Sequence, residues 1–461
     1  MDNMKDVKEY WGEWILPGRK NEKFLGVLRL SQTEHPLLLL PNLPSDFELP
    51  LRGLDDSPKI FGTTILNKKK ISLFQCNFNE SKKNHLISKK QILKIFPLIV
   101  FIDDDSDNDY IMELEKFARE SFDLEYNLLY NWLWSYLKKS TENYTIVSSE
   151  INIDGNKYTI DFNLNESGED TIRNTYVQRN IRLVIKSKDR DITFIEALKF
   201  NQYFQTFLSF ATTEIIRVQK LLGYTRKKVK IPVEMRDKFQ GRSEVSLPLS
   251  VECIIYQGNI IKNLKESSGQ MFFDYKCLSE NISFKESFEK WISLYEELSF
   301  YPDMFDSLYG DKLDAVSYFI LLIPRIEQYY INRHGNKKIE NIFNELIAEN
   351  KEVLKRARVL EGKDFEEVIT YKNTGKKNCE NERKDQFKIF RFAEECKNVR
   401  HFYAHLNKCY SDKIPQDTYE LARLSEKLKL FFDVLVLKEL GLKSEESIIE
   451  ALKYARAKTV L

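Results

Sequence analysis

The sequence has few of the features that would place the chain outside the cell or in a membrane. Six cysteines are scattered over 461 residues without CxxC or metal-ligand spacing, which predicts unpaired thiols in a reducing compartment. The first thirteen residues are polar and charged, so no secretory signal peptide is expected. The longest apolar run, 92–102, is too short to span a bilayer and is interrupted by Lys94 and Pro97. These absences predict a soluble cytoplasmic protein.

The chain also lacks an excess of charge, because 71 basic and 70 acidic residues leave a formal net charge of +1. Overall electrostatics therefore neither favour nor exclude a nucleic-acid partner, and any RNA-binding site must be local. The sequence contains no internal repeat, no phosphate-binding glycine loop and no G-x-S-x-G nucleophile motif. None of these signatures offers a candidate site.

The length predicts two or three domains, each able to bury a core, in an α+β multidomain chain. We expect a β-rich region over 1–305, with a subdivision near 105–140, and an all-α bundle over 311–461. Within the first region, residues 110–140 are expected to be helical, and 192–210 to form a short helix whose phenylalanines pack in the core. Strands are expected over 24–30, 36–40, 60–65, 71–76, 144–186, 213–219, 227–233 and 246–256.

The second region is expected to contain only helices and loops. The expected helices are 313–332, with a kink at Pro324, 338–360, 382–410, 415–440 and 443–458. Pro415 is expected to open the fourth helix and Gly441 to cap its end. Short connections favour an up-and-down bundle.

Residues 396–411, CKNVRHFYAHLNKCYS, form the most informative stretch. At about 100° per residue, one helical face is apolar and the other is polar and free of acids. The apolar stripe consists of Phe392, Cys396, Val399, Phe402, Tyr403, Leu406 and Tyr410. The polar arc consists of Lys397, Asn398, Arg400, His401, His405, Asn407 and Lys408. His401 and His405 are four residues apart and are expected to share a face.

Three ordinary interpretations of these histidines stay open. They could be hydrogen-bonded core residues, although their position opposite the apolar stripe argues against that. They could belong to a solvated basic face. They could also bind zinc together with Cys396 or Cys409. Against this, Cys396 belongs to the apolar stripe, and Cys409 lies on the far side of Arg400 around the helical wheel.

The run Arg400-His401-Phe402-Tyr403-Ala404-His405 resembles the Arg-polar-x3-His motif of the HEPN superfamily of helical nucleases and matches it in full. The resemblance implies a metal-independent endoribonuclease without a cofactor, cleaving RNA, tRNA included, in a site shared by two paired motif helices of a homodimer. In RNA the nucleophile is the 2′-OH beside the scissile phosphate, so the enzyme must move protons and stabilise phosphate charge. Arg400 would hold the phosphate, His405 would be the main general base or acid, and His401 would be a second proton-transfer group or phosphate donor.

Other residues complete the expected site. Lys397, Asn398, Asn407 and Lys408 are expected to bind RNA, and Glu327, on the first helix of the bundle, is expected to orient Arg400 or a histidine. No metal ligand is assigned.

The N-terminal region carries a second resemblance. Residues 10–17, YWGEWILP, followed by Gly26-Val27-Leu28, Ile60-Phe61-Gly62 and Ile71-Ser72-Leu73, are similar to the N-terminal domain of ApeA-type anti-phage proteins, which carry a C-terminal HEPN domain. The resemblance implies abortive defence against phage, with the N-terminal region sensing a trigger, expected to be a phage-derived protein, or restraining the nuclease. The rival interpretations are a catalytically inactive HEPN module that binds nucleotide or protein, and, less favoured, a zinc-dependent hydrolase.

Overall fold

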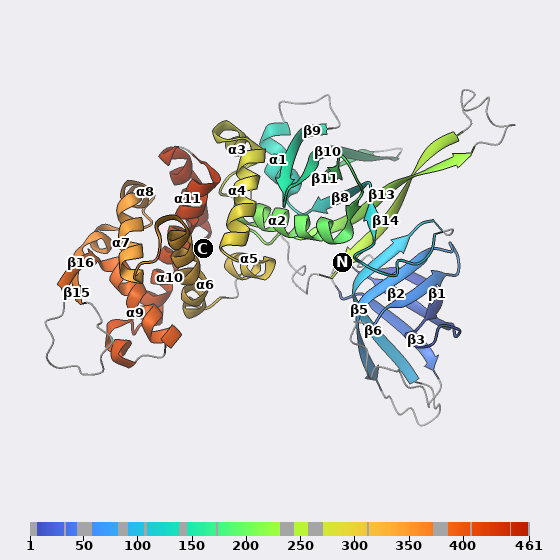
Figure 1. Ribbon diagram of the computed structural model, residues 1–461, viewed down its shortest axis with the longest axis horizontal. Helices are drawn as coiled ribbons and strands as arrows, with labels where there is room; N and C mark the ends of the chain where they lie inside the picture. Colours follow the sequence, from blue (N-terminus) through green and yellow to red (C-terminus); the bar gives the residue numbers. More distant parts are fainter. Residues whose placement is uncertain are drawn as a thin grey trace. The chain divides into compact units, whose positions relative to one another are not determined.

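The computed structural model describes residues 7–31, 34–43, 58–81, 91–105, 108–137, 145–171, 174–230, 244–256, 271–310, 313–371, 386–405, 408–442 and 444–459. The chain divides into two compact units (Figure 1). The first comprises residues 1–130, 142–201 and 217–267, and the second comprises 131–141, 202–216 and 268–461. The second unit therefore takes in two short segments from the N-terminal half. The predicted division at 305–311 stays a prediction, and helix α5 (Pro302–Tyr309) lies beside it.

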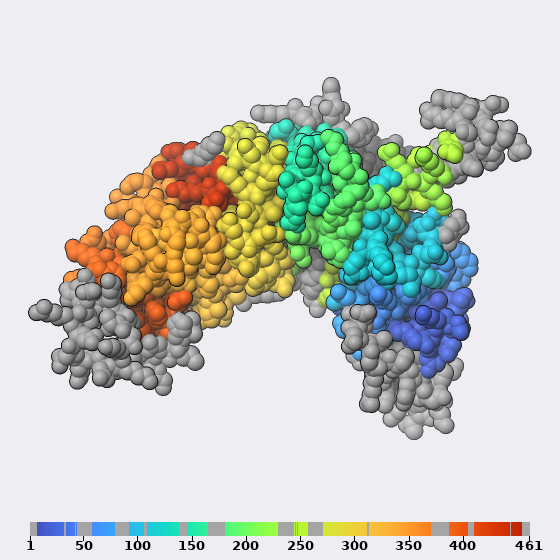
Figure 2. Space-filling model, in the orientation of Figure 1, coloured from blue at the N-terminus to red at the C-terminus, as the bar shows by residue number. Residues whose placement is uncertain are grey.

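The first unit is built on a twelve-stranded antiparallel sheet with the order β3-β2-β1-β4-β5-β6-β14-β13-β8-β11-β10-β9. Its strands are β1 (Lys8–Ile15), β2 (Phe24–Leu30), β3 (Leu37–Leu43), β4 (Ile60–Thr64), β5 (Lys70–Ser81), β6 (Gln91–Asp103), β8 (Ser121–Tyr126), β9 (Thr145–Ile153), β10 (Asn156–Thr171), β11 (Asn174–Ser187), β13 (Val218–Lys230) and β14 (Glu244–Ile255). A further pairing of β3 with β6 closes the first six strands on themselves. In the space-filling view these strands form a continuous blue and cyan body (Figure 2). The β-rich N-terminal region predicted from the sequence is confirmed.

Trp14 is the central side chain of the closed part. The strand alternation of β1 turns Trp14 inward, where it is fully buried. Its ring lies against Gly62 of β4, where an added Cβ would come within 2.4 Å of the indole. Glycine at position 62 therefore provides the space that the tryptophan ring fills.

The open part of the sheet has one apolar and one polar face. Phe122, Leu124 and Tyr126 of β8 alternate toward the core, where Phe122 packs beside Phe194 at the start of α2 (Phe194–Thr212). The helix expected over 110–140 is therefore wrong before Leu129, because the alternating pattern 121–126 has the period of a strand. Among the described residues of that range, only α1 (Leu129–Leu137) is helical, and β7 (Ala118–Arg119) pairs with β12 (Ile192–Thr193). Of the strands expected over 213–219 and 227–233, residues 218–219 and 227–230 belong to one strand, β13, while 213–217 are not strand and 231–233 lie outside the described residues.

The second unit is mostly helical, which confirms the helical C-terminal region. Its remaining helices are α3 (Tyr275–Asn281), α4 (Phe284–Glu297), α6 (Ala315–His334), α7 (Ile339–Glu349), α8 (Lys351–Arg356), α9 (Arg391–His405), α10 (Thr418–Leu440) and α11 (Glu445–Thr459). Trp291 of α4 packs among phenylalanine rings, and its indole N–H donates to the carbonyl of Tyr203 at 3.0 Å. The expected phenylalanine core of the helix near 192–210 is confirmed.

Several predicted helix boundaries in this unit are corrected. Residues 386–390 form strand β16, which pairs with β15 (Glu367–Tyr371), so the helix expected from 382 begins only at Arg391. The alternating sequence QFKIF suits that hairpin better than a helix. The helix expected over 338–360 is divided at Asn350, which caps α7 and precedes α8.

The fourth helix begins at Thr418 rather than at Pro415, because the carboxylate of Asp417 accepts the N–H of Tyr419 and caps the helix. Its predicted end is confirmed, since Gly441 adopts a left-handed conformation with φ 96°. Among the helices of the described ranges, none is long and apolar enough to cross a membrane.

Candidate active site

Helix α9 carries the motif and is held in the bundle by its apolar stripe. Phe392, Cys396 and Val399 are fully buried. Phe392 packs against Phe431 of α10, with ring centroids 6.0 Å apart, and against Phe343 of α7. The stripe therefore fixes the rotation of the helix about its axis, which decides where Arg400 and His401 lie.

Arg400 forms an ion pair with Glu327 of α6. An Nη2 group of Arg400 donates to Glu327 Oε2 at 2.8 Å, and the two side chains are 27% and 16% exposed. The contact expected from the sequence is therefore present, while its orienting role stays a prediction. Within the described part of the chain this is the single acceptor that Arg400 contacts, so other guanidinium N–H groups stay available to a ligand.

His401 lies half-buried against Tyr410. The two rings are stacked, with centroids 5.0 Å apart and planes 20° from parallel. Tyr410 comes from η4 (Lys408–Lys413), a 3-10 turn that follows the end of α9 at His405. The helical wheel assigned Tyr410 to the apolar stripe, opposite the histidines. That placement is corrected, because the helix ends at His405 and later residues no longer follow its period.

Lys397 and Asn398 do not lie on an open basic face. They are 7% and 5% exposed. Lys397 Nζ donates to Glu394 Oε2 at 2.7 Å, and Asn398 Nδ2 donates to the carbonyl of Lys413 at 3.5 Å. The prediction of a polar face opposite the buried stripe is therefore wrong at these two positions, because both side chains are buried and Glu394, one turn earlier on α9, pairs with Lys397. Their role in RNA binding stays a prediction.

For the remaining residues of the expected site, the structure describes either the backbone alone or nothing. His405 is the last residue of α9, and Lys408 is the first of η4. The side chains of both lie outside the described residues, as does all of Asn407. The structure brings Glu327 to Arg400 and Tyr410 to His401, and it does not test the position of the His405 imidazole.

Two contacts of this site were not predicted from the sequence. Glu394 pairs with Lys397, and the signal was their spacing of three residues on one helix. The stack of Tyr410 on His401 had no local signal, because it depends on the turn after His405.

Cys396 does not suit zinc. Cys396 is fully buried in the apolar stripe, and burial raises the pKa of its thiol well above its ordinary value, which disfavours the thiolate that zinc binds. Across the described ranges, no group of three or more His, Cys, Asp or Glu side chains has a metal-binding arrangement. The side chains of His405 and Cys409 lie outside that search.

Two family models match the chain. The family described as ApeA N-terminal domain 1 matches residues 9–291, more than half of the chain. The family described as Apea-like HEPN matches residues 321–446, which include Glu327 and the whole of the motif. Neither a search of curated proteins nor a search of solved structures returned a significant match. With the first match covering most of the β-rich region and the second the motif-bearing helices, the chain belongs to the ApeA family of HEPN-type anti-phage defence proteins.

Proposed function

We propose that this protein is a metal-independent endoribonuclease that cleaves cellular RNA, tRNA included, when a phage infects the cell. The N-terminal unit would sense a trigger or restrain the nuclease until the trigger arrives. Restraint is required because unregulated RNA cleavage would kill the host.

The arrangement of Arg400 is the observation that carries this proposal. One nitrogen of its guanidinium donates to Glu327. This contact would orient the side chain and leave other donors for a phosphate oxygen. Positioned charged donors of this kind stabilise the negative charge that develops on a phosphorane. Arginine also suits the task because its guanidinium stays protonated at every physiological pH.

The proton transfers fall to the histidines. His405 would take the proton of the 2′-OH, whose oxygen then attacks phosphorus while the bond from phosphorus to the 5′-oxygen breaks. A second group, His401, would protonate that leaving oxygen or donate to the phosphate. The Tyr410 ring holds the plane of the His401 imidazole, which reduces the orientations the imidazole can sample.

The nature of the RNA products tests the proposed reaction. We expect the purified protein to cleave total cellular RNA equally well with and without EDTA, leaving 2′,3′-cyclic phosphate and 5′-OH ends, because the 2′-OH supplies the nucleophile. End-specific labelling of the fragments measures this. Products with 3′-OH ends, or cleavage restored only by a divalent metal, would contradict the mechanism. Absence of cleavage together with tight nucleotide binding would favour the inactive HEPN module.

We also propose that the nuclease acts as a homodimer through its C-terminal helices. Arg400 and His405 lie about 140° apart around one helix, so one helix does not easily direct both at a single phosphate. Two motif helices facing each other across a two-fold axis would solve this, because one could supply the arginine and the other the histidine.

Mixing inactive chains tests that arrangement. Arg400→Ala and His405→Ala proteins, each inactive alone, should recover part of the cleavage activity when mixed, since a mixed dimer rebuilds one intact site. Activity is measured after subunit exchange, with each variant mixed with itself as the control. A fully active monomer in sedimentation analysis would rule out the paired site.

A further inference from the structure

The polar face of the open sheet in the first unit contains a groove of about 760 Å³. It runs over β8, β11 and β13, on the side opposite the apolar face that packs near α2. It adjoins a second groove of about 730 Å³, since Asp191, Thr225 and Arg226 line both. The two hollows are therefore neighbours.

The charges along these grooves are unevenly matched. Each lysine and arginine that lines them lies within 4.0 Å of a carboxylate. Arg182, for example, pairs with Glu125 at 2.7 Å, and Lys186 pairs with Asp161 at 3.0 Å. The lining cations are therefore already neutralised, which makes an anionic ligand such as a nucleic acid a poor fit.

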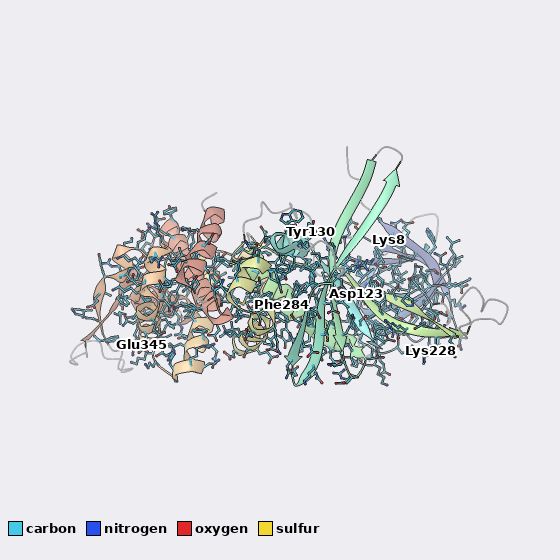
Figure 3. All side chains as sticks on the ribbon, turned by 90° about the horizontal axis from the view of Figure 1, so that it is seen from above. Lys8, Asp123, Tyr130, Lys228, Phe284 and Glu345 are labelled. Atoms are coloured by element: carbon cyan, nitrogen blue, oxygen red, sulfur yellow. The ribbon has the colours of Figure 1, made fainter. Side chains whose placement is uncertain are left out.

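Some of the lining acids, in contrast, form no ion pair within 4.0 Å, although Arg182, Lys186 and Lys220 face Asp123 from a greater distance. Within the described part of the chain, the carboxylates of Asp123 and Asp191 in the first groove make no hydrogen bond or ion pair, and neither does Asp109 in the second. Asp123 (labelled in Figure 3) is half-buried on the floor, beside Val184 and Leu222 in the strand register. Burial raises its pKa to about 6, although Arg182 and Lys186 oppose that rise. An ionised carboxylate held there without a partner costs stability.

An aromatic ring lies next to this carboxylate. Tyr224 of β13 is opposite Ser121, two residues from Asp123 and on the same face of the sheet, and it lines the same groove. In the described structure neither the Tyr224 hydroxyl nor the Ser121 hydroxyl has a hydrogen-bond partner. A carboxylate, an aromatic ring face and a hydroxyl without a partner are groups that recognise a guanidinium. The guanidinium donates hydrogen bonds to the oxygens in its own plane and stacks its face on the ring.

We propose that this groove binds a peptide segment of another protein through an arginine or lysine side chain that pairs with Asp123 and lies against Tyr224. Asp191 and Asp109 would receive further basic side chains along the same segment. If the proposed function holds, the segment would belong to the trigger protein. Only this assignment of the segment rests on the proposed function. Binding itself is independent of RNA cleavage.

Peptide binding to the full-length protein tests the site. The probe is acetyl-Gly-Arg-Gly-Arg-Gly-amide, with the same peptide carrying glutamate in place of arginine as the counter-probe, and binding is measured by isothermal titration calorimetry at pH 8. We expect the arginine peptide alone to bind. Asp123→Asn should weaken binding at least tenfold, while Glu9→Gln, which removes an equal charge on β1, should leave the affinity unchanged.

The pH dependence separates Asp123 from the other acids. Asp123 faces Arg182, Lys186, Lys220 and Glu125. As the pH falls through 6, protonation of Asp123 should weaken wild-type binding and leave the already weakened Asp123→Asn variant nearly unchanged. Asp123→Asn should retain its melting temperature, because it removes a buried unpaired charge, so loss of binding will not reflect unfolding.

Two results would overturn the proposal. One is equal affinity of wild type and Asp123→Asn for the arginine peptide. The other is displacement of that peptide by a 2′-O-methyl RNA oligonucleotide, which cannot be cleaved, because it would assign the groove to nucleic acid. Peptide binding is measured without RNA cleavage. A failure of peptide binding would therefore not contradict the nuclease proposal, and a failure of RNA cleavage would not contradict the groove proposal.

Discussion

Replacing Arg400 by alanine is expected to reduce RNA cleavage by about a thousandfold and to abolish toxicity in cells, because loss of one positioned donor to a developing phosphate charge has an effect of about this size. The variant should remain folded. Arg400 is partly exposed, and its loss leaves Glu327 at 16% exposure, close enough to water to be solvated. Single-turnover cleavage of a defined RNA gives the rate, and thermal unfolding gives the stability.

Two variants provide the controls. Arg400→Lys keeps the charge and its attraction to Glu327 but loses the fork of donors, so a large part of the activity should still be lost. Glu327→Gln keeps a hydrogen-bond acceptor beside Arg400 and should retain more activity than Glu327→Ala if Glu327 orients the arginine. Wild-type cleavage by Arg400→Ala would rule out the assigned site.

Replacing Lys427 by methionine is expected to destabilise the second unit by about 3–5 kcal/mol, because it leaves a buried carboxylate unpaired. Lys427 of α10 donates to both oxygens of Asp364, at 2.8 and 2.7 Å, and Asp364 is 1% exposed. Asp364 lies in η3 (Gly362–Phe365), which precedes the β15–β16 hairpin that leads into α9. This ion pair therefore anchors the segment before the motif helix to α10. Urea denaturation followed by circular dichroism measures the loss.

A double variant and an exposed ion pair serve as controls for this buried one. Lys427→Met combined with Asp364→Leu should recover most of the lost stability, since neither charge then remains buried. Arg356→Met removes an exposed pair with Glu445 and Glu446, and should cost less than about 1 kcal/mol. A similar loss for Lys427→Met and Arg356→Met would mean that burial of Asp364 does not govern the effect.

Much of the local structure follows from the sequence. The order Arg400-His401-x3-His405 identified the candidate site, and the period of Phe392, Cys396 and Val399 placed the apolar side of α9 correctly. Gly441 marked the end of α10 because a left-handed residue there favours glycine. Each of these features depends on residues within a few positions of one another, which is the range over which periodicity and capping act.

The tertiary structure decided the features that depend on distant segments. The sequence nominated Glu327, but the packing of α6 on α9 brought its carboxylate to Arg400, across 73 positions of the chain. Folding likewise buried Lys397 and Asn398, turned Tyr410 back onto His401, and converted residues 386–390 into a strand paired with β15. The groove around Asp123 likewise depends on the pairing of β8, β11 and β13, which are distant in the sequence. Burial and charge pairing are properties of neighbours in space, and local periodicity does not specify those neighbours.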